Sequence, residues 1–179
     1  WRSRVQLVFQ DPFRSLDPMQ RVDGMLIEAL GYADPPVPAD ERQQAARAAL
    51  IDVGLDAAAL HRYPSQFSGG QRQRLAIARA LATRPRVLIC DEATSALDHD
   101  TQAQILALLD QLARERQLAL LFISHDLHAI ARLCDSLLVL DRGRVVETGV
   151  PASLLVNPAS DALRALVEAL PRPRMHRQA

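Results

Sequence analysis

The chain has 179 residues, of which 49% are apolar and 23% charged, a balance typical of a globular domain with a buried core. Its 21 basic and 21 acidic residues cancel, which argues against a general nucleic-acid surface. The longest apolar stretch, around Leu118 to Ile123, is too short to cross a bilayer. The chain contains no lysine, so every motif that needs one is excluded.

In chain order, the first part of the sequence predicts one strand followed by helices. Residues 4–9 form an apolar strand that Gln10-Asp11-Pro12 ends. We then expect helices at 22–30, at 41–53 with Asp40 as the cap, and at 69–81 after Ser68. The segment from about 15 to 82 is therefore a mostly helical block.

After Pro85 the pattern changes to alternating strands and helices. We expect strands at 87–90, 119–123 and 137–140, helices at 99–116 and 126–133, and a turn that leads into a hairpin strand at 145–146. The tail over 152–170 is expected to be helical. This alternation is typical of an α/β fold with a largely parallel sheet.

Ser68-Gly69-Gly70-Gln71 opens the third expected helix. A serine cap followed by two residues without Cβ atoms leaves backbone N–H groups accessible to an anion. The first turn of a helix adds about half a positive charge at the same place. The motif alone fits an anion-binding turn and an ordinary capped helix about equally well.

Asp91 and Glu92 directly follow the apolar run 87–90. Carboxylates at the carboxyl end of a buried parallel strand lie where open α/β sheets bind their ligands. There Asp91 would lie near a magnesium ion that bridges two phosphates, and Glu92 would orient or deprotonate an attacking water. A solvated acidic pair at the end of a strand is the alternative.

Three further polar residues are less informative by themselves. Gln10 ends the first strand, Asp98 precedes a helix that it could simply cap, and His125 follows the strand at 119–123. Each has an ordinary structural interpretation, and a lone histidine at a strand end is more often structural than catalytic. The order of these residues along the chain is stronger evidence for a functional role than the chemistry of each residue alone.

Taken in order, these motifs resemble the ATPase subunits of the ABC transporter family over nearly the whole chain. The resemblance matches Gln10 to the Q-loop, 67–71 to the signature motif, 86–92 to the Walker B strand, 95–98 to the D-loop and His125 to the switch histidine. It implies a P-loop NTPase-type fold with a parallel-sheet core and a helical subdomain. The corresponding regions are 1–14 with the Q-loop, 15–83 as the helical subdomain, 84–150 as the α/β core and 151–179 as an extension.

The resemblance also implies a role for each matched residue, with ATP and Mg²⁺ as ligands. Glu92 would polarise the hydrolytic water, and His125 would contact the γ-phosphate. Gln10 and Asp91 would contact the metal. Ser68, Gly69, Gly70 and Gln71, together with Asp98, would contact nucleotide in a head-to-tail dimer of two ATPase subunits.

Within the family, the residues most resemble importers of the oligopeptide, dipeptide and nickel type. The similarity lies in Val8-Phe9-Gln10-Asp11-Pro12-Phe13, Arg62-Tyr63-Pro64 and Val156-Asn157-Pro158. It implies a peripheral subunit on the cytoplasmic face of the membrane that drives solute import through permease subunits, with no nucleic-acid partner. The alternatives are a soluble, non-transport ABC ATPase, a catalytically incompetent partner half, and the second half of a fused chain.

One departure from the family is large. The lysine-containing loop G-x-x-x-x-G-K-[ST], the Walker A motif that cradles phosphates, cannot occur in a chain without lysine. Because the sequence also starts at Trp1, we expect an upstream segment with this loop and further core strands. We predict that the isolated 179 residues are inactive and leave a sheet edge and apolar surface uncovered.

Overall fold

The computed structural model describes residues 3–170. The chain folds into two compact units, Trp1–Ile123 and Ser124–Ala179. Between residues 3 and 170, no helix combines the length and the apolar character that crossing a bilayer requires.

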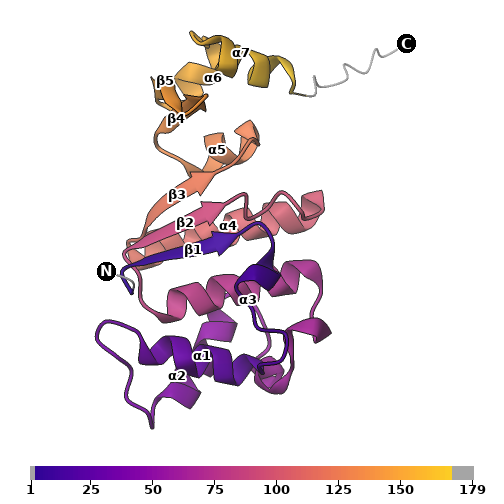
Figure 1. Cartoon of the computed structure of the whole chain (residues 1–179), viewed down its shortest axis with the longest axis vertical. Coiled ribbons are helices and arrows are strands. Elements are labelled where there is room, and N and C mark those ends of the chain that lie inside the picture. The colour runs from indigo at the N-terminus through magenta and orange to yellow at the C-terminus, as the bar shows by residue number, and fades with distance from the viewer. Residues whose placement is uncertain (1–2, 171–179) are drawn as a thin grey trace. The chain divides into compact units, whose positions relative to one another are not determined.

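The described part of the first unit contains a small sheet and a set of helices (Figure 1). Its strands are β1 (Val5–Phe9), β2 (Val87–Asp91) and β3 (Ala119–Ile123). Its helices are α1 (Val22–Gly31), α2 (Arg42–Asp52), α3 (Gly69–Ala82) and α4 (His99–Arg116). Short 3-10 turns η1 (Pro12–Arg14), η2 (Ala57–His61) and η3 (Pro64–Gln66) connect them. The elements expected from the sequence are confirmed, with small shifts at their ends.

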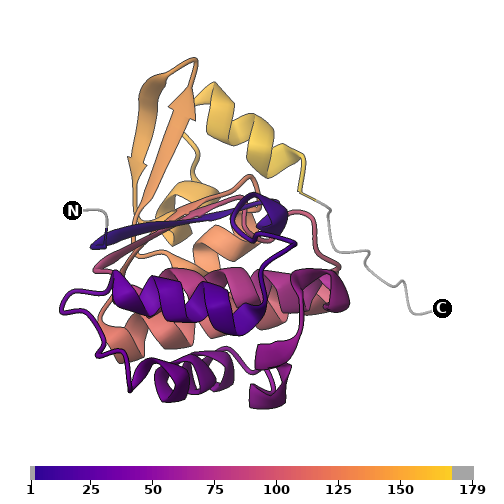
Figure 2. The same ribbon diagram turned by 60° about the horizontal axis from the view of Figure 1, so that its bottom comes forward.

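The three strands are parallel and lie in the order β1-β2-β3. One face of the sheet is covered by α3 and α4 (Figures 1 and 2). The side chains that point to this face are apolar and buried: Val8 is 1% exposed, Leu88 1%, Cys90 0% and Phe122 9%. Burial of these side chains holds the strands against the helices and fixes their register.

The opposite face of the sheet is apolar but much more exposed. Leu7, Ile89 and Leu121 lie in one row across the three strands, and Ile123 lies one pleat further along β3. Leu7 is 38% exposed, Leu121 53% and Ile123 47%. Among residues 3–170, β3 pairs only with β2, so its outer edge carries no further strand. Strands of a parallel sheet are normally covered on both faces, and this one is not.

A helical layer packs on the far side of α3. Helices α1 and α2 contact each other and α3, and each of the three helices contains a fully buried leucine, namely Leu26, Leu50 and Leu75 at 0% exposure. The expected cap of α2 is wrong: Glu41, without a side-chain hydrogen bond, takes the N-cap position and not Asp40. The Glu41 N–H donates to the Pro38 carbonyl (3.1 Å) and closes a turn that contains Asp40. Asp40 therefore lies one residue before the N-cap position.

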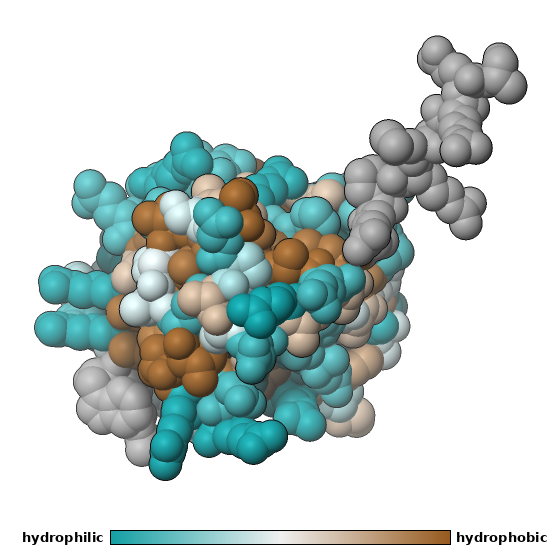
Figure 3. Space-filling view, turned by 90° about the horizontal axis from the view of Figure 1, so that it is seen from above, coloured by the Kyte–Doolittle hydropathy of each residue, from teal (hydrophilic) through white to brown (hydrophobic). Residues whose placement is uncertain are grey.

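The described part of the second unit consists of α5 (Leu127–Leu133), the strands β4 (Leu137–Asp141) and β5 (Arg144–Gly149), α6 (Pro151–Val156) and α7 (Asp161–Glu168). Strands β4 and β5 form the expected antiparallel hairpin, with Gly143 in the turn at φ +76°. Its outward side chains are partly apolar, including Leu138 at 53% and Leu140 at 64% exposure. Figure 3 shows hydrophobic side chains gathered among polar ones on one face of the molecule.

The tail over 152–170 is helical as expected, and the structure divides it into two helices, α6 and α7. The first ends before Pro158, whose ring fixes φ and removes the N–H that a continuous helix needs. The second begins with Ser160 as its cap, and Glu147 from β5 accepts hydrogen bonds from the Ala159 N–H, the Ser160 N–H and the Ser160 hydroxyl at 2.9, 2.9 and 2.6 Å.

The expected division at residues 14, 83 and 150 remains a prediction. In the structure, the helices from α1 to α3 belong to the same compact unit as the sheet, and the second unit begins at Ser124. The expected extension continues to 179, and its end lies outside the described residues.

Candidate functional site

The carboxyl ends of β1 and β2 bring three of the expected site residues to one edge of the sheet. The last paired row joins Phe9, Asp91 and Ile123. Gln10 and Glu92 each lie one residue beyond this row, on adjacent strands. Gln10 and Asp91 are exposed and Glu92 is half-buried. Strand pairing between segments far apart in sequence therefore gathers an amide and two carboxylates at one place.

The backbone of Glu92 adopts an unusual conformation. Its φ is +47°, in the left-handed region that costs a residue with a side chain about 1–2 kcal/mol. The turn is held by a hydrogen bond from the Glu92 N–H to the Ile123 carbonyl (2.9 Å) and by Ser95, whose N–H and hydroxyl donate to the Glu92 carbonyl at 3.1 and 3.0 Å. Non-glycine residues held in this region occur often at functional sites. Here the turn directs the chain out of the strand right after Asp91.

The side chains at this edge supply some, but not all, of the oxygen ligands that a magnesium ion needs. Asp91 offers a carboxylate and Gln10 an amide oxygen, both of the hard kind that Mg²⁺ prefers. Among the described residues, no group of three or more His, Cys, Asp or Glu side chains could hold a metal by itself. That donor set is what Mg²⁺ needs when phosphates and waters supply its remaining ligands.

The N-terminal turn of α3, residues 68–71, is the signature turn. It is closed by a capping box, in which Ser68 and Gln71 each accept a hydrogen bond from the backbone of the other. The Ser68 hydroxyl accepts from the Gln71 N–H (3.3 Å), and the Gln71 side-chain oxygen accepts from the Ser68 N–H (3.0 Å). The Gln71 side chain thus turns back onto the helix start. A Cβ atom at Gly69 would meet nothing within 4 Å, so this side of the turn is open.

Gly70 faces the other way, into the N-terminal turn of α4. A Cβ atom there would lie 2.4 Å from Cγ2 of Thr101. Thr101 is held by Asp98, whose carboxylate accepts from the Thr101 N–H (2.9 Å) and hydroxyl (2.7 Å). These hydrogen bonds lower the pKa of Asp98 from its ordinary value of 3.8. The structure therefore joins the signature turn to Asp98 through a residue that the sequence analysis did not single out.

His125 belongs to the second unit, where it is exposed and lies just ahead of α5. Its neighbour Asp126 caps α5 by accepting from the His128 and Ala129 N–H groups at 2.9 and 3.3 Å. The first unit thus forms two groups of expected site residues. One group, at the carboxyl ends of β1 and β2, consists of Gln10, Asp91 and Glu92. The other consists of the signature turn and Asp98, which Thr101 joins. The grouping of His125 with them remains a prediction.

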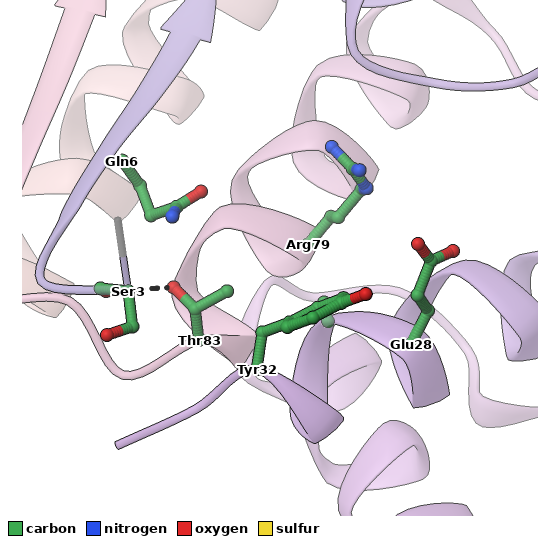
Figure 4. Close-up of a pocket in the computed structure, with 7 residues that line it drawn as sticks. Ser3, Gln6, Glu28, Tyr32, Arg79 and Thr83 are labelled. Atoms are coloured by element: carbon green, nitrogen blue, oxygen red, sulfur yellow. Dashed lines mark hydrogen bonds between the residues drawn. The ribbon is translucent and has the colours of Figure 1, made fainter. Parts of the chain in front are cut away.

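A cavity of the described chain lies elsewhere. It has a volume of about 690 Å³ and lies near the start of β1, between that strand and helices α1 and α3 (Figure 4). It is lined by Ser3, Gln6, Glu28, Ala29, Tyr32, Arg79 and Thr83. None of the expected site residues lines it. The residues predicted to carry the chemistry therefore lie outside this cavity, and Gln10, Asp91 and Glu92 lie at the carboxyl edge of the sheet.

A family model described as ABC transporter matches residues 1–95. The chain belongs to the ABC transporter family. Among curated relatives, it is 48% identical over 168 residues to the peptidoglycan transport ATP-binding protein YejF of Agrobacterium fabrum, covering 94% of this chain and 31% of that protein. It is 42% identical over 172 residues to the oligopeptide transport ATP-binding protein OppF of Escherichia coli, covering 96% of this chain and 52% of that protein. The chain thus spans 31% of the length of the first relative and 52% of that of the second.

Solved structures agree on the fold. CbiO1 of Clostridium perfringens, part of the ABC transporter complex cbiONQ, matches with a TM-score of 0.75 and 29% identity, over 87% of this chain and 60% of that one. The ATP-binding cassette MJ0796, solved as a dimer in a post-hydrolysis state with ADP and Pi, matches with a TM-score of 0.69 and 28% identity, over 83% and 63%. The predicted P-loop NTPase-type α/β fold is thereby confirmed.

Proposed function

We propose that this chain is part of an ATP-hydrolysing subunit that drives the import of peptides or similar small solutes through an ABC permease. The observation that carries the proposal is the convergence of Gln10, Asp91 and Glu92 at the carboxyl edge of one parallel sheet. The names of the relatives as peptide and oligopeptide transport ATP-binding proteins support the solute class. The subunit would act at the cytoplasmic face of the membrane.

Glu92 has the role of general base or water-orienting group in this proposal. Its left-handed backbone turn lies directly after Asp91, at the carboxyl end of β2. Asp91 and Gln10 would hold Mg²⁺, which supplies charge neutralisation between phosphate groups. His125 would contact the γ-phosphate as a hydrogen-bond donor. Phosphoryl transfer needs mainly such positioning and charge stabilisation, rather than covalent chemistry by the protein.

The signature turn would bind nucleotide held by a second subunit. The N-terminus of α3 carries partial positive charge, its serine cap is neutral, and the position above Gly69 is open. These properties suit a phosphate that arrives from outside the chain. A head-to-tail dimer of two ATPase subunits would place the signature turn of each against the nucleotide of the other.

The proposal is tested with Glu92→Gln in the native protein that contains this chain. Removal of the carboxylate is expected to lower ATP turnover at least about 100-fold, the usual range for loss of a general base, while ATP affinity stays within about threefold. Glu115→Gln is the matched control, because Glu115 is an exposed glutamate near the end of α4. Near-normal turnover of the Glu92 variant would refute the role given to this residue.

The 179 residues contain no lysine, so this stretch by itself has no lysine-containing phosphate loop. Without the lysine loop, nothing in the chain itself cradles the β- and γ-phosphates. We therefore expect the purified 179-residue chain to show no tight, magnesium-dependent binding of ATP by calorimetry. Tight binding would contradict that expectation and require another phosphate-binding segment within the chain.

A further inference from the structure

The segment that carries Gln10 has few contacts of its own. After β1 ends at Phe9, the chain makes the short turn η1, in which the Asp11 carboxylate accepts from the Phe13 N–H (3.0 Å). No residue of η1 is buried, and Phe13 is 46% exposed. Such a turn, with its polar groups bonded only locally, has no fixed position unless other elements hold it.

Helix α3 supplies the contacts that hold this segment. Gln73 is 1% exposed, and its side-chain amide donates to the carbonyl of Phe9, the residue before Gln10 (3.3 Å). The guanidinium carbon of Arg72 lies 4.7 Å from the centre of the Phe13 ring, three residues after Gln10. Two consecutive residues of α3 therefore contact the chain before and after Gln10, at Phe9 and at Phe13.

Arg72 also contacts the signature turn. Its Nη1 donates to the carbonyl of Phe67 (2.8 Å), and Phe67 directly precedes the cap residue Ser68. Phe67 is itself 4% exposed, with Arg62 stacked on its ring at 4.5 Å. The Nε of Arg72 is buried and has no hydrogen-bond partner among the described residues. One planar side chain thus bonds the start of the signature turn with one nitrogen and covers the ring of Phe13 with its face.

We propose that Arg72 and Gln73 are positioning residues that make the Gln10 segment and the signature turn move as one body. A displacement of Gln10 would then change the orientation of Ser68 and Gly69 without any direct contact between the two sites. The identity of the ligands rests on the proposed function, but the mechanical link rests only on the contacts of Arg72 and Gln73.

Arg74 provides a matched control on the same helix. Its Nη1 donates to a backbone carbonyl, that of Val53, at 2.7 Å, and its Nη2 donates to Gln104 (3.2 Å). It therefore makes the same kind of bond as Arg72, but to α2's end and to α4 rather than to the Gln10 segment. Arg72→Met and Arg74→Met remove similar interactions from α3, and only the first should free Gln10.

The first test is amide hydrogen exchange of the native protein without nucleotide. The Arg14, Ser15 and Leu16 N–H groups bond to the Asp11 and Pro12 carbonyls at 3.1 Å each and report on the turn. Arg72→Met and Phe13→Leu are each expected to speed exchange of these amides about tenfold, and Arg74→Met less than twofold. Unchanged exchange in Arg72→Met, or an equal increase in Arg74→Met, would overturn the proposal. Because no nucleotide is present, the result does not depend on the proposed function.

The second test is a double-mutant cycle on ATP turnover. If Arg72 acts through Phe13, the double variant Arg72→Met/Phe13→Leu should have the same kcat as the slower single variant, with the KM for ATP unchanged. Multiplied effects would show that the two side chains act independently and would contradict the link. If neither the wild type nor any variant hydrolyses ATP, the proposed function is wrong. The hydrogen-exchange result would remain valid in that case, because it is measured without nucleotide.

Discussion

Helices α3 and α4 begin side by side, yet their first turns are built in opposite ways. Helix α3 starts with an uncharged cap, Ser68, and an open position at Gly69. Helix α4 starts with Asp98, whose two carboxylate oxygens both accept hydrogen bonds from Thr101. The positive end of α4 is therefore neutralised by its own cap, and that of α3 is not.

This difference shows how one sequence feature, a polar cap followed by a helix, can serve two purposes. An acidic cap with satisfied oxygens stabilises the helix and repels a phosphate. A neutral cap followed by glycines gives up some helix stability and leaves N–H groups for an external anion. Gly70 joins the two turns, since its missing side chain lets Thr101 approach closely.

The largest effect is expected from making the two turns alike with Ser68→Asp. The new carboxylate would cap α3 as well as serine does, but it would occupy the anion-binding end of the helix and repel phosphate. We expect ATP turnover of the native protein to fall about 100-fold or more, with the melting temperature unchanged or higher. Ser65→Asp, in the exposed turn η3, is the control. Wild-type turnover in the Ser68 variant would remove the signature turn from the mechanism.

An intermediate effect is expected from breaking the contact between the turns. Gly70→Ala would place a Cβ atom 2.4 Å from Cγ2 of Thr101, whose rotamer is fixed by its bond to Asp98. Overpacking of this kind costs about 1–3 kcal/mol, measured by urea unfolding of the native protein.

Two further variants make the Gly70 experiment specific. Thr101→Ser removes the methyl group and keeps the hydroxyl that bonds Asp98, so it should restore most of the stability lost in Gly70→Ala. Gly69→Ala meets nothing within 4 Å and should not destabilise the protein. Equal losses in Gly69→Ala and Gly70→Ala would contradict the difference between these two positions.

The smallest effect concerns a third way of building a helix start, that of α7. Here the carboxylate comes from another element: Glu147 of β5 accepts hydrogen bonds from the Ser160 hydroxyl and from the Ala159 and Ser160 N–H groups ahead of α7, and these bonds lower its pKa from the ordinary value of 4.5. Because the folded-state pKa is the lower one, the contribution of this carboxylate is complete above pH 4.5 and is lost as the pH falls through the folded-state pKa.

Glu147→Gln should therefore produce a small loss of stability at pH 7 that disappears in acid. Thermal unfolding followed from pH 7 to pH 3 measures it: the difference in melting temperature between wild type and variant should shrink below pH 4.5. Glu168→Gln, at the end of α7, should give no such pH dependence. A difference that stays constant with pH would mean that the charge of Glu147 contributes nothing.

Much of the first unit was predictable because its signals are local. The apolar runs of β2 and β3, the serine before two glycines, and the acidic pair after a strand each lie within a few residues. Their order along the chain was enough to indicate the family. The left-handed backbone conformation of Glu92, with a φ of +47°, was not predicted from the sequence.

What escaped prediction depends on distances between segments far apart in sequence. The approach of Thr101 to Gly70 and the bond from Gln73 to Phe9 are set by how α3 packs on α4 and β1. The break between α6 and α7 carries a local signal, Pro158, but the partner that stabilises the new start, Glu147, lies on a different element. Likewise, one turn before α2 was enough to move its cap from Asp40 to Glu41.

The outer edge of β3 affects how this polypeptide behaves in the test tube. Within residues 3–170 no strand pairs with this edge, so its N–H and C=O groups, next to the exposed side chains of Leu121 and Ile123, can template the addition of a strand from another molecule. Expressed alone, the 179 residues are therefore prone to inclusion bodies and to light scattering that grows with concentration. Co-expression with a polypeptide that pairs with the outer edge of β3 would raise the soluble yield more than any single substitution that adds a surface charge.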